Sequence, residues 1–391
     1  MENVDNELGL IVGIDLREDS AMLSFYDKEK DIVNQLEFDN RQEYFFNVSL
    51  KEMLKEEEGL REGEYKKLTQ IFLYMLEELR KKTGLTKLLS LSVVLHNYSI
   101  DYLNAVFRVI ENLGLNQTNS QIISKSESFA YYAYSQKREL YIGGVCLVDF
   151  EKNRLKYVRF NSKRVNNVDY IVEDKKEYNS IEFAEVLNKE KTLEDIEDLL
   201  ISSLNEFLDR KILSSIYLTG EGFNTDKLPE EYTKLITNRR KAFIGNNLYS
   251  KGACYAAKEL IMPKVFDNTV LLSEERIMVG IELDILDRGV NKRFRLIKPG
   301  TNWFMADRTV DFIIEDIREI KLHIITADKM FEDEAIDISD FPYREGKTTR
   351  ISISIKFYSA SRCQIIVKDL GFGDFYKSSG KLVYKDLDFA I

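Results

Sequence analysis

The chain has 391 residues, 44% of them hydrophobic and 12% aromatic, which is enough to bury more than one core and excludes wholesale disorder. Its 66 acidic and 56 basic residues leave a formal net charge of −10, which excludes sequence-independent binding to DNA or RNA through an extended basic face. We therefore expect no nucleic-acid partner.

Cysteines and histidines are too few and too scattered for several kinds of site. Cys146, Cys254 and Cys363 are odd in number and far apart, which argues against a disulfide framework or a zinc knuckle. His96 and His323 lie near no nucleophile-like serine or cysteine, so a Ser–His or Cys–His hydrolase is not expected. The chain also lacks a run of about 20 apolar residues and a secretory signal pattern. These features predict a soluble, cytoplasmic protein without membrane insertion.

The first 137 residues alternate short apolar strands with amphipathic helices. Strands are expected at residues 10–15, 21–26, 32–38, 88–95 and 122–123. One helix carries apolar residues at spacings of three and four and ends at Gly84. A second helix is expected between a cap at Ser99 and Gly114, and a third at about 126–134. This alternation predicts a mixed α/β layer.

The same pattern then repeats. An apolar run at 145–149 closes on Asp149, as the run at 10–15 closes on Asp15. It is followed by a strand at 155–160, a helix beginning at Thr192, a strand at 215–219, the turn Gly220-Glu221-Gly222 and a helix at about 248–259. Two successive units, each opening with a strand that ends in aspartate, predict a duplicated, two-lobed α/β domain.

After about residue 265 the helical periodicity largely disappears. Residues 350–357 alternate strictly between apolar and polar side chains, which is typical of a strand with one buried face. Similar runs occur at 310–314, 322–325 and 364–367. Turn signals such as Pro299-Gly300 separate the runs, so this part of the chain is predicted to be an all-β sandwich.

Several segments in order resemble a known family. Residues 13–16, which read Gly-Ile-Asp-Leu, are similar to the start of the phosphate-binding turn of DnaK. Ser126-Glu127-Ser128 and the aromatic residues after it resemble a DnaK helix, 270–272 resembles its apolar interdomain linker, and 296–301 resembles a turn of its peptide-binding sandwich. The chain thus resembles a divergent bacterial, DnaK-like member of the actin, sugar-kinase and heat-shock chaperone superfamily, mainly by the order of these segments.

The resemblance implies a fold and its boundaries. It implies a two-lobed, actin-like domain, which is a duplicated ribonuclease-H-like fold, at residues 1–265, with lobes at about 1–137 and 138–265. A linker at 266–275 would lead to a β-sandwich domain at 276–391, like the DnaK substrate-binding domain but without its helical lid. The implied cofactors are ATP and Mg²⁺.

The resemblance also implies site residues. Asp15 and Asp149 would hold the water shell of Mg²⁺, and Glu127 would orient the attacking water. The nucleotide itself would contact Leu16, Arg17, Gly220, Glu221, Gly222 and Lys251. From the residues alone, each aspartate can instead cap a turn by accepting backbone N–H bonds, and we favour turn capping over catalysis. For Gly220 and Gly222, a plain tight turn and an adenosine platform remain equal alternatives.

Departures from the DnaK pattern argue against catalysis. Glycines let backbone N–H groups approach phosphate oxygens, but residues 17–19 read Arg-Glu-Asp where DnaK has Gly-Thr-Thr. Residues 150–154 likewise replace a glycine-rich second turn. Acidic side chains at the first turn would repel a triphosphate. We therefore expect a degenerate site that binds ATP and Mg²⁺ weakly or binds no cofactor, and a pseudo-ATPase rather than an enzyme.

The predicted function is chaperone-related binding of a polypeptide partner through the β domain. The alternatives are an active Mg-ATP hydrolase, resting on Asp15, Glu127 and Asp149, and an actin-like structural or scaffold protein. Near the C-terminus, Phe372 and Phe375 are expected to be core rings of a hairpin turn, in preference to an exposed recognition loop.

Overall fold

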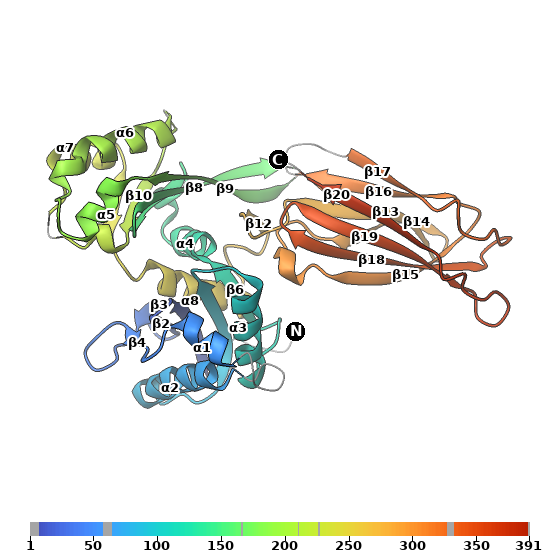
Figure 1. Cartoon of the computed structure of the whole chain (residues 1–391), viewed down its shortest axis with the longest axis horizontal. Helices are drawn as coiled ribbons and strands as arrows, with labels where there is room; N and C mark the ends of the chain where they lie inside the picture. The colour runs from blue at the N-terminus through green and yellow to red at the C-terminus, as the bar shows by residue number, and fades with distance from the viewer. Residues whose placement is uncertain are drawn as a thin grey trace. The chain divides into compact units, whose positions relative to one another are not determined.

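A computed structural model describes residues 8–57, 65–165, 167–209, 211–225, 227–326 and 332–389 (Figure 1). The chain forms two compact units. The α/β unit consists of the described residues up to Ser162 together with Glu173–Asn268, and the β unit consists of Lys163–Val172 together with the described residues from Thr269 onward. The change from mixed α/β to β-rich structure agrees with the prediction.

The first sheet of the α/β unit has the order β3-β2-β1-β5-β6, with β4 paired to β2. Its strands are β1 (Leu10–Leu16), β2 (Ser20–Asp27), β3 (Ile32–Gln35), β4 (Tyr44–Phe45), β5 (Leu88–Leu95) and β6 (Ser120–Ser124). Strand β1 pairs antiparallel with β2 and parallel with β5. The accompanying helices are α1 (Leu50–Glu57), α2 (Lys66–Thr83), α3 (Ile100–Asn112) and α4 (Lys125–Tyr134).

The second sheet has the order β11-β10-β7-β8-β9-β12. Its strands are β7 (Val145–Glu151), β8 (Arg154–Val165), β9 (Val168–Asn179), β10 (Ser215–Thr219), β11 (Lys241–Ile244) and β12 (Thr269–Leu272). Strand β7 pairs antiparallel with β8 and parallel with β10, as β1 does with β2 and β5. The order β9-β8-β7-β10-β11 therefore repeats the order of the first sheet.

Helices α5 (Ile181–Leu187), α6 (Glu197–Leu208) and α7 (Glu230–Thr237) pack on this second sheet through one buried core (Figure 1). The helix predicted to begin at Thr192 starts at Glu197 instead, after a 3₁₀ turn. Strands β9 and β11 and helices α5 and α7 were not predicted. Their segments are short or highly charged, so they carry little hydrophobic periodicity.

Helices α4 and α8 (Leu248–Ile261) form the centre of the α/β unit. Helix α8 lies directly on the first sheet because Gly13 has no side chain: a Cβ there would lie 2.0 Å from the backbone nitrogen of Cys254. Gly252 permits an equally close contact with α4, since its Cβ would lie 2.0 Å from the carbonyl oxygen of Ser128. Helix α4 contacts the second sheet through Phe129. These contacts place the N-termini of both helices beside the ends of β1 and β7.

The predicted helix caps are present in part. Gly84 follows α2 in the left-handed conformation, with φ of 72°, as the C-terminal glycine signal predicts. Ser99 occupies the N-cap position of α3, but its side chain makes no capping hydrogen bond. Over the described ranges, no helix is long and apolar enough to span a membrane.

The β unit contains two four-stranded sheets, β14-β13-β16-β17 and β15-β18-β19-β20. The strands are β13 (Val279–Asp287), β14 (Val290–Ile297), β15 (Arg308–Ile314), β16 (Glu319–Thr326), β17 (Glu332–Asp337), β18 (Thr349–Ser359), β19 (Arg362–Gly371) and β20 (Leu382–Asp388). One hydrophobic core draws side chains from both sheets. It includes the alternate residues Ile351, Ile353, Ile355 and Phe357 of β18, which accounts for the strict alternation there.

Two local expectations for the β unit need correction. Residues 270–272, which resemble an apolar linker, lie in strand β12, which pairs parallel with β9 at residues 169–172. Phe375 is 89% exposed, so the expectation that it is a core ring is wrong. Gly371 has φ of 70° and Phe372 pairs with Tyr376, and this tight turn leaves Phe375 at its tip. Trp303 is half-buried against the core, and its Nε1 donates to the Glu275 carboxylate at 3.1 Å.

Candidate functional site

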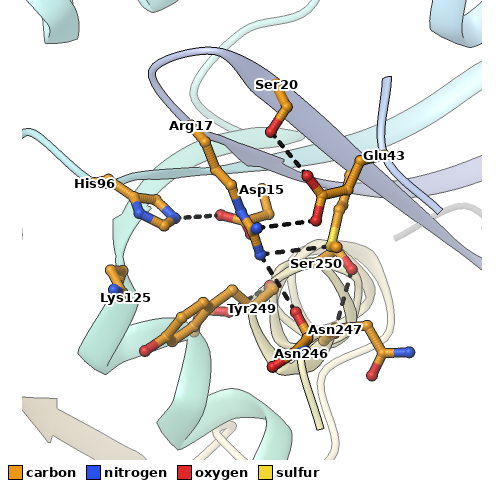
Figure 2. Close-up of polar contacts among 12 residues, drawn as sticks. Asp15, Arg17, Ser20, Glu43, His96, Lys125, Asn246, Asn247, Tyr249 and Ser250 are labelled. Atoms are coloured by element: carbon orange, nitrogen blue, oxygen red, sulfur yellow. Dashed lines mark hydrogen bonds and ion pairs between the residues drawn. The ribbon is translucent and has the colours of Figure 1, made fainter. Parts of the chain in front are cut away.

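The end of β1 carries a buried aspartate held between two basic groups. Asp15 is 0% exposed, its Oδ1 lies 2.7 Å from Nε2 of His96, and its Oδ2 accepts a 2.9 Å hydrogen bond from Nε of Arg17 (Figure 2). Burial by itself would raise the pKa of the Asp15 carboxyl, but Arg17 and His96 outweigh burial and hold this pKa well below its usual range. Asp15 is therefore ionised at neutral pH.

Arg17 connects three segments of the α/β unit. Besides Asp15, its guanidinium contacts the Glu43 carboxylate at 3.2 Å and donates to the carbonyl of Asn246 at 3.3 Å (Figure 2). Ser20 donates to the other oxygen of Glu43 at 3.1 Å. The turn after β1 is thus tied both to the segment before β4 and to the segment before α8.

The end of β7 carries a second buried aspartate with different partners. Asp149 is 5% exposed, and its Oδ2 receives hydrogen bonds from Nζ of Lys125 at 2.5 Å and from the hydroxyl of Tyr249 at 2.7 Å. Lys125 also contacts Oε2 of Glu151 at 2.8 Å. The other Asp149 oxygen, Oδ1, is buried without a hydrogen-bond partner.

Tyr249 joins the two aspartate clusters. Its hydroxyl bonds to Asp149, and its ring meets the ring of His96 edge-on, with 5.8 Å between centroids. His96 in turn contacts Asp15. Burial, together with the nearby carboxylates, raises the pKa of Tyr249 well above its ordinary value, so the phenol remains a hydrogen-bond donor. Asp15 and Asp149 are thus linked through one continuous chain of contacts.

A cleft of about 1070 Å³ lies over these clusters. Of the residues that the sequence suggested for a nucleotide site, Leu16, Arg17, Gly220 and Glu221 line the cleft, whereas Glu127, Gly222 and Lys251 do not. Asp15 and Asp149 do not line it either, although their partners Arg17, His96, Lys125 and Tyr249 do. The remaining wall carries both acidic and basic side chains: Glu18, Asp19, Glu43, Lys51, Lys55, Asp101, Glu151, Lys152 and Arg154.

Glu127 and Lys251 lie in helices beside the cleft. Glu127 is 0% exposed at the third position of α4, and it forms a capping box with Ser124, whose N–H donates to Oε2 of Glu127 at 2.8 Å. Lys251 is half-buried on α8, and burial lowers the pKa of its ammonium group. The capping box accounts for the buried position of the Glu127 side chain. Neither Glu127 nor Lys251 lines the cleft.

The glycine turn after β10 packs against the second aspartate strand. Gly220 has φ of 98°, and a Cβ there would lie 2.4 Å from the carbonyl oxygen of Phe150. A Cβ on Gly222 would lie 2.2 Å from the Phe150 ring. Both glycines are therefore required by close packing on the residue that follows Asp149.

Sequence reasoning missed His96, Lys125 and Tyr249 as site residues. A signal for His96 existed, because β5 runs parallel to β1 and pairs Leu95 with Leu16, so His96 must follow at the same sheet edge. Lys125 lies at the first position of α4, and Tyr249 lies at the second position of α8. Their roles depend on how α4 and α8 pack, which no local pattern specifies.

The aspartates as they stand do not fit a bound Mg²⁺–polyphosphate group. Both oxygens of Asp15, and Oδ2 of Asp149, already bond to side chains. Arg17 and Lys125 are shared among four carboxylates, Asp15, Glu43, Asp149 and Glu151, so even a protonated His96 would leave the cluster with excess negative charge. Within the part of the chain that the structure describes, no group of three or more His, Cys, Asp or Glu residues is arranged to hold a metal ion.

Comparisons with known proteins place the chain in a family. Residues 37–274 match the model described as "Family of unknown function (DUF5716) C-terminal", which covers more than half of the chain, so the chain belongs to this family. Residues 276–389 match a second model, "Domain of unknown function (DUF8552)". The two matches meet just after β12.

Two further comparisons complete this picture. The search of curated proteins found no match. Among solved structures, the chain is similar to the crystal structure of ethanolamine utilization protein EutJ from Carboxydothermus hydrogenoformans, with 14% sequence identity and a TM-score of 0.39. The alignment covers 64% of this chain and 91% of that chain.

Proposed function

We propose that this chain is an actin-like, DnaK-related protein with a degenerate nucleotide site, and that it acts by binding a polypeptide partner through its β unit. Two features support the actin-like assignment: the two α/β sheets share one strand order, and each contains a central strand that ends in a buried aspartate. The following unit of two four-stranded sheets over one core supports the likeness to a peptide-binding sandwich.

The observation that carries the proposal is the occupation of both aspartates by basic side chains. A Mg²⁺-nucleotide could bind Asp15 through Oδ2, or Asp149 through its own Oδ2, only after Arg17 or Lys125 had left. Breaking a buried ion pair by removing one partner costs about 3–5 kcal/mol, which is a large share of the roughly 8 kcal/mol that micromolar binding supplies. The ion pairs thus favour a protein that does not turn over ATP.

For nucleotide binding, calorimetric titration of the full chain with Mg-ATP is the direct test. We expect no binding, or an affinity no tighter than millimolar. Micromolar binding that Asp15→Ala abolishes would contradict the proposal and favour an active ATPase. One observation keeps that second candidate open: the cleft of about 1070 Å³ is large enough for a small-molecule ligand and includes Gly220 in its wall.

An exposed aromatic residue on a loop of the β unit is the feature that favours a polypeptide partner. Phe375 is 89% exposed at the tip of the loop between β19 and β20. The base of this loop is held by Asp369, whose carboxylate accepts hydrogen bonds from the backbone N–H groups of Gly371 and Ser379 at 3.0 and 2.7 Å. Aromatic side chains are enriched among the residues that carry most of the binding free energy at protein interfaces.

Polypeptide binding can be tested with the full chain and labelled peptides of about seven residues with apolar centres. We expect Phe375→Ala to weaken the best-bound peptide about tenfold, as loss of a binding hot spot does. Tyr358→Ala is the matched control, because Tyr358 is also exposed, at 55%. It lies near the C-terminal end of β18, whereas the loop begins beside the N-terminal end of that strand. Equal effects of the two substitutions, or no peptide binding by the parent chain, would contradict this part of the proposal.

A further inference from the structure

Lys125 occupies a position whose ligands are those of a hard cation. Its Nζ lies 2.5 Å from Oδ2 of Asp149 and 2.8 Å from Oε2 of Glu151, and it also lies 4.8 Å from the centroid of the Tyr249 ring. The Lys125 side chain is only 14% exposed, although lysine is among the residues least often buried. Carboxylate oxygens in this arrangement are the ligands that Mg²⁺ and Ca²⁺ take in proteins.

The Lys125 ammonium keeps its charge in this setting. Burial by itself would lower its pKa, but Asp149 and Glu151 outweigh burial and raise the pKa above the ordinary value. The pKa of Glu151 is correspondingly lowered, chiefly by Lys125, against the opposing effect of burial. The pair is therefore ionised on both sides at neutral pH, and the charge of Lys125 is permanently available to the two carboxylates.

Arg17 occupies the corresponding place at the end of β1. It pairs with Asp15 and Glu43 and donates to the carbonyl of Asn246, next to the start of α8. Lys125 likewise belongs to the first turn of α4 while its partners belong to β7. Each basic side chain thus joins an aspartate-bearing strand end to a second segment of the α/β unit.

We propose that Arg17 and Lys125 are tethered cations, which supply from within the chain the positive charge that a metal-bound ligand would bring to Asp15 and Asp149. This inference rests on the proposed degenerate site and deepens it. An ammonium or guanidinium at hydrogen-bond distance neutralises a carboxylate as a bound ion does. Because both cations are part of the chain, no ligand is needed to hold α4 and α8 against the ends of β1 and β7.

The inference predicts that the stability of the Lys125→Met variant depends on divalent cations. That substitution keeps much of the length of the side chain but removes its charge, which leaves the buried Asp149 and the partly exposed Glu151 without the ammonium group between them. Oδ2 of Asp149 keeps its hydrogen bond from Tyr249, whereas Oδ1 of Asp149 and the Glu151 carboxylate can then bind a divalent ion. We expect the variant to depend on a dissolved cation where the parent chain does not.

Thermal unfolding of the full chain, followed by far-ultraviolet circular dichroism, measures this dependence, because the α-helices of the described residues lie in the α/β unit. We expect Lys125→Met to lower the melting temperature by on the order of 10 °C. Millimolar MgCl₂ or CaCl₂ should recover at least half of this loss, whereas KCl of equal ionic strength should not. The melting temperature of the parent chain should not respond to either divalent salt.

Lys258→Met is the matched control. The Lys258 side chain is also 14% exposed, also pairs with an aspartate and also lies over a tyrosine ring, at 3.9 Å from the centroid of Tyr26. Its partner Asp31, however, is 70% exposed and is not shared with a buried carboxylate. Lys258→Met should therefore gain no response to divalent ions. Adding Asp149→Asn to Lys125→Met should remove the response, because the ligand itself is lost.

The possible outcomes separate the tethered-cation inference from the proposed function. A Lys125→Met chain that unfolds on its own must regain its helical signal in MgCl₂; failure to do so overturns the inference. A variant that folds but ignores divalent ions, or a parent chain that they stabilise equally, also overturns it. The proposed function fails separately, if Mg-ATP but not MgCl₂ raises the melting temperature of the parent chain, since nucleotide would then bind despite the internal ion pairs.

Discussion

The two units of the molecule each bury an aspartate against an arginine, but in different surroundings. In the β unit, Arg344 and Asp369 have side chains 4% and 0% exposed and form two parallel hydrogen bonds of 2.7 and 2.8 Å. In the α/β unit, Arg17 makes one 2.9 Å hydrogen bond to Asp15 and keeps 26% of its side chain exposed at the wall of a cleft.

The hydrogen-bond partners of each pair indicate its role in the fold. Besides Arg344, the Asp369 carboxylate accepts hydrogen bonds from backbone N–H groups of the loop that follows β19. We call this pair closed, because its partners are buried or belong to the same loop, and its role is structural. Arg17 divides its donors among Asp15, Glu43 and Asn246, so it joins segments around an open cleft. Substitution in the closed pair should therefore cause a large loss in the free energy of unfolding, and substitution of the shared Arg17 should cause a smaller one.

The largest expected effect comes from breaking the closed pair. Arg344→Ala leaves the Asp369 carboxylate buried without its counter-ion and should lower the free energy of unfolding of the β unit by about 3–5 kcal/mol. Urea unfolding followed by fluorescence of Trp303, the only tryptophan in the chain, measures this. Lys347→Ala is the control, because Lys347 and Glu315 form an exposed pair worth about 0.5 kcal/mol. Similar losses in both variants would show that the Arg344 pair is not structural in the way we describe.

A smaller loss is expected for Arg17→Ala. His96 still contacts Asp15, and solvent from the cleft can reach the vacated space, so we expect a loss of about 2–3 kcal/mol for the α/β unit. Circular dichroism of the helices during urea unfolding is the measurement. Arg108→Ala serves as control, since Arg108 pairs with Glu111 at the exposed surface of α3. A loss for Arg17→Ala as large as that for Arg344→Ala would erase the proposed distinction.

Acid should destabilise both units in the same direction. In both aspartates burial alone would raise the carboxyl pKa, but Arg17 and His96 at Asp15, and Arg344 with the Ser379 contacts at Asp369, lower it well below its usual range. A lowered pKa in the folded state gives stability that is present above the unfolded value of about 3.9 and is lost as pH falls below it. Asp369→Asn should flatten this acid dependence in Trp303 fluorescence only, and Asp15→Asn only in circular dichroism.

The smallest expected effect concerns His323 on β16, which gives the β unit a dependence of opposite sign. Its ring bonds to the carboxylates of Asp284 at 3.0 Å and Asp333 at 2.7 Å. The hydrogen bond to Asp284, assisted by Asp333 against burial and nearby Arg293, raises the pKa of His323. A raised folded-state pKa gives stability that is present below about 6.5 and is lost as pH rises through the folded-state value.

Both carboxylates are more than half exposed, so solvent screening limits this contribution to about 0.5 kcal/mol. Trp303 fluorescence during urea unfolding at about pH 6 and pH 8 should reveal it, and His323→Gln should remove the difference. A parent chain whose β unit gains stability as pH rises across this interval would contradict the assignment.

Much of the fold was predictable from local patterns. The apolar runs that became β1, β5 and β7 lie buried in their sheets, and the periodic stripe of α2 is fully buried up to the glycine stop at Gly84. Strict alternation in β18 correctly indicated one buried face. Strand β9 was missed because charged residues make up half of its length, and only its pairing with β8 and β12 makes it a strand.

The site was predictable only at its two anchors. Aspartates at the ends of two similar apolar runs indicated that Asp15 and Asp149 occupy equivalent strand ends, and the sheet order agrees with that equivalence. The sequence Arg17-Glu18-Asp19, which places a basic and two acidic side chains directly after this strand end, was likewise visible in the chain. Which basic group would neutralise Asp149 was not visible, since Lys125 lies far from it in sequence.

The chain by itself determined where carboxylates end strands, where helices stop and which faces are apolar, because those properties follow from neighbouring residues and their periodicity. The packing of distant segments, by contrast, brings Lys125 and Tyr249 to Asp149 and leaves Phe375 exposed to solvent. Helix α8 approaches β1 and α4 as closely as Gly13 and Gly252 allow, and charge pairing depends on the distances that this packing sets.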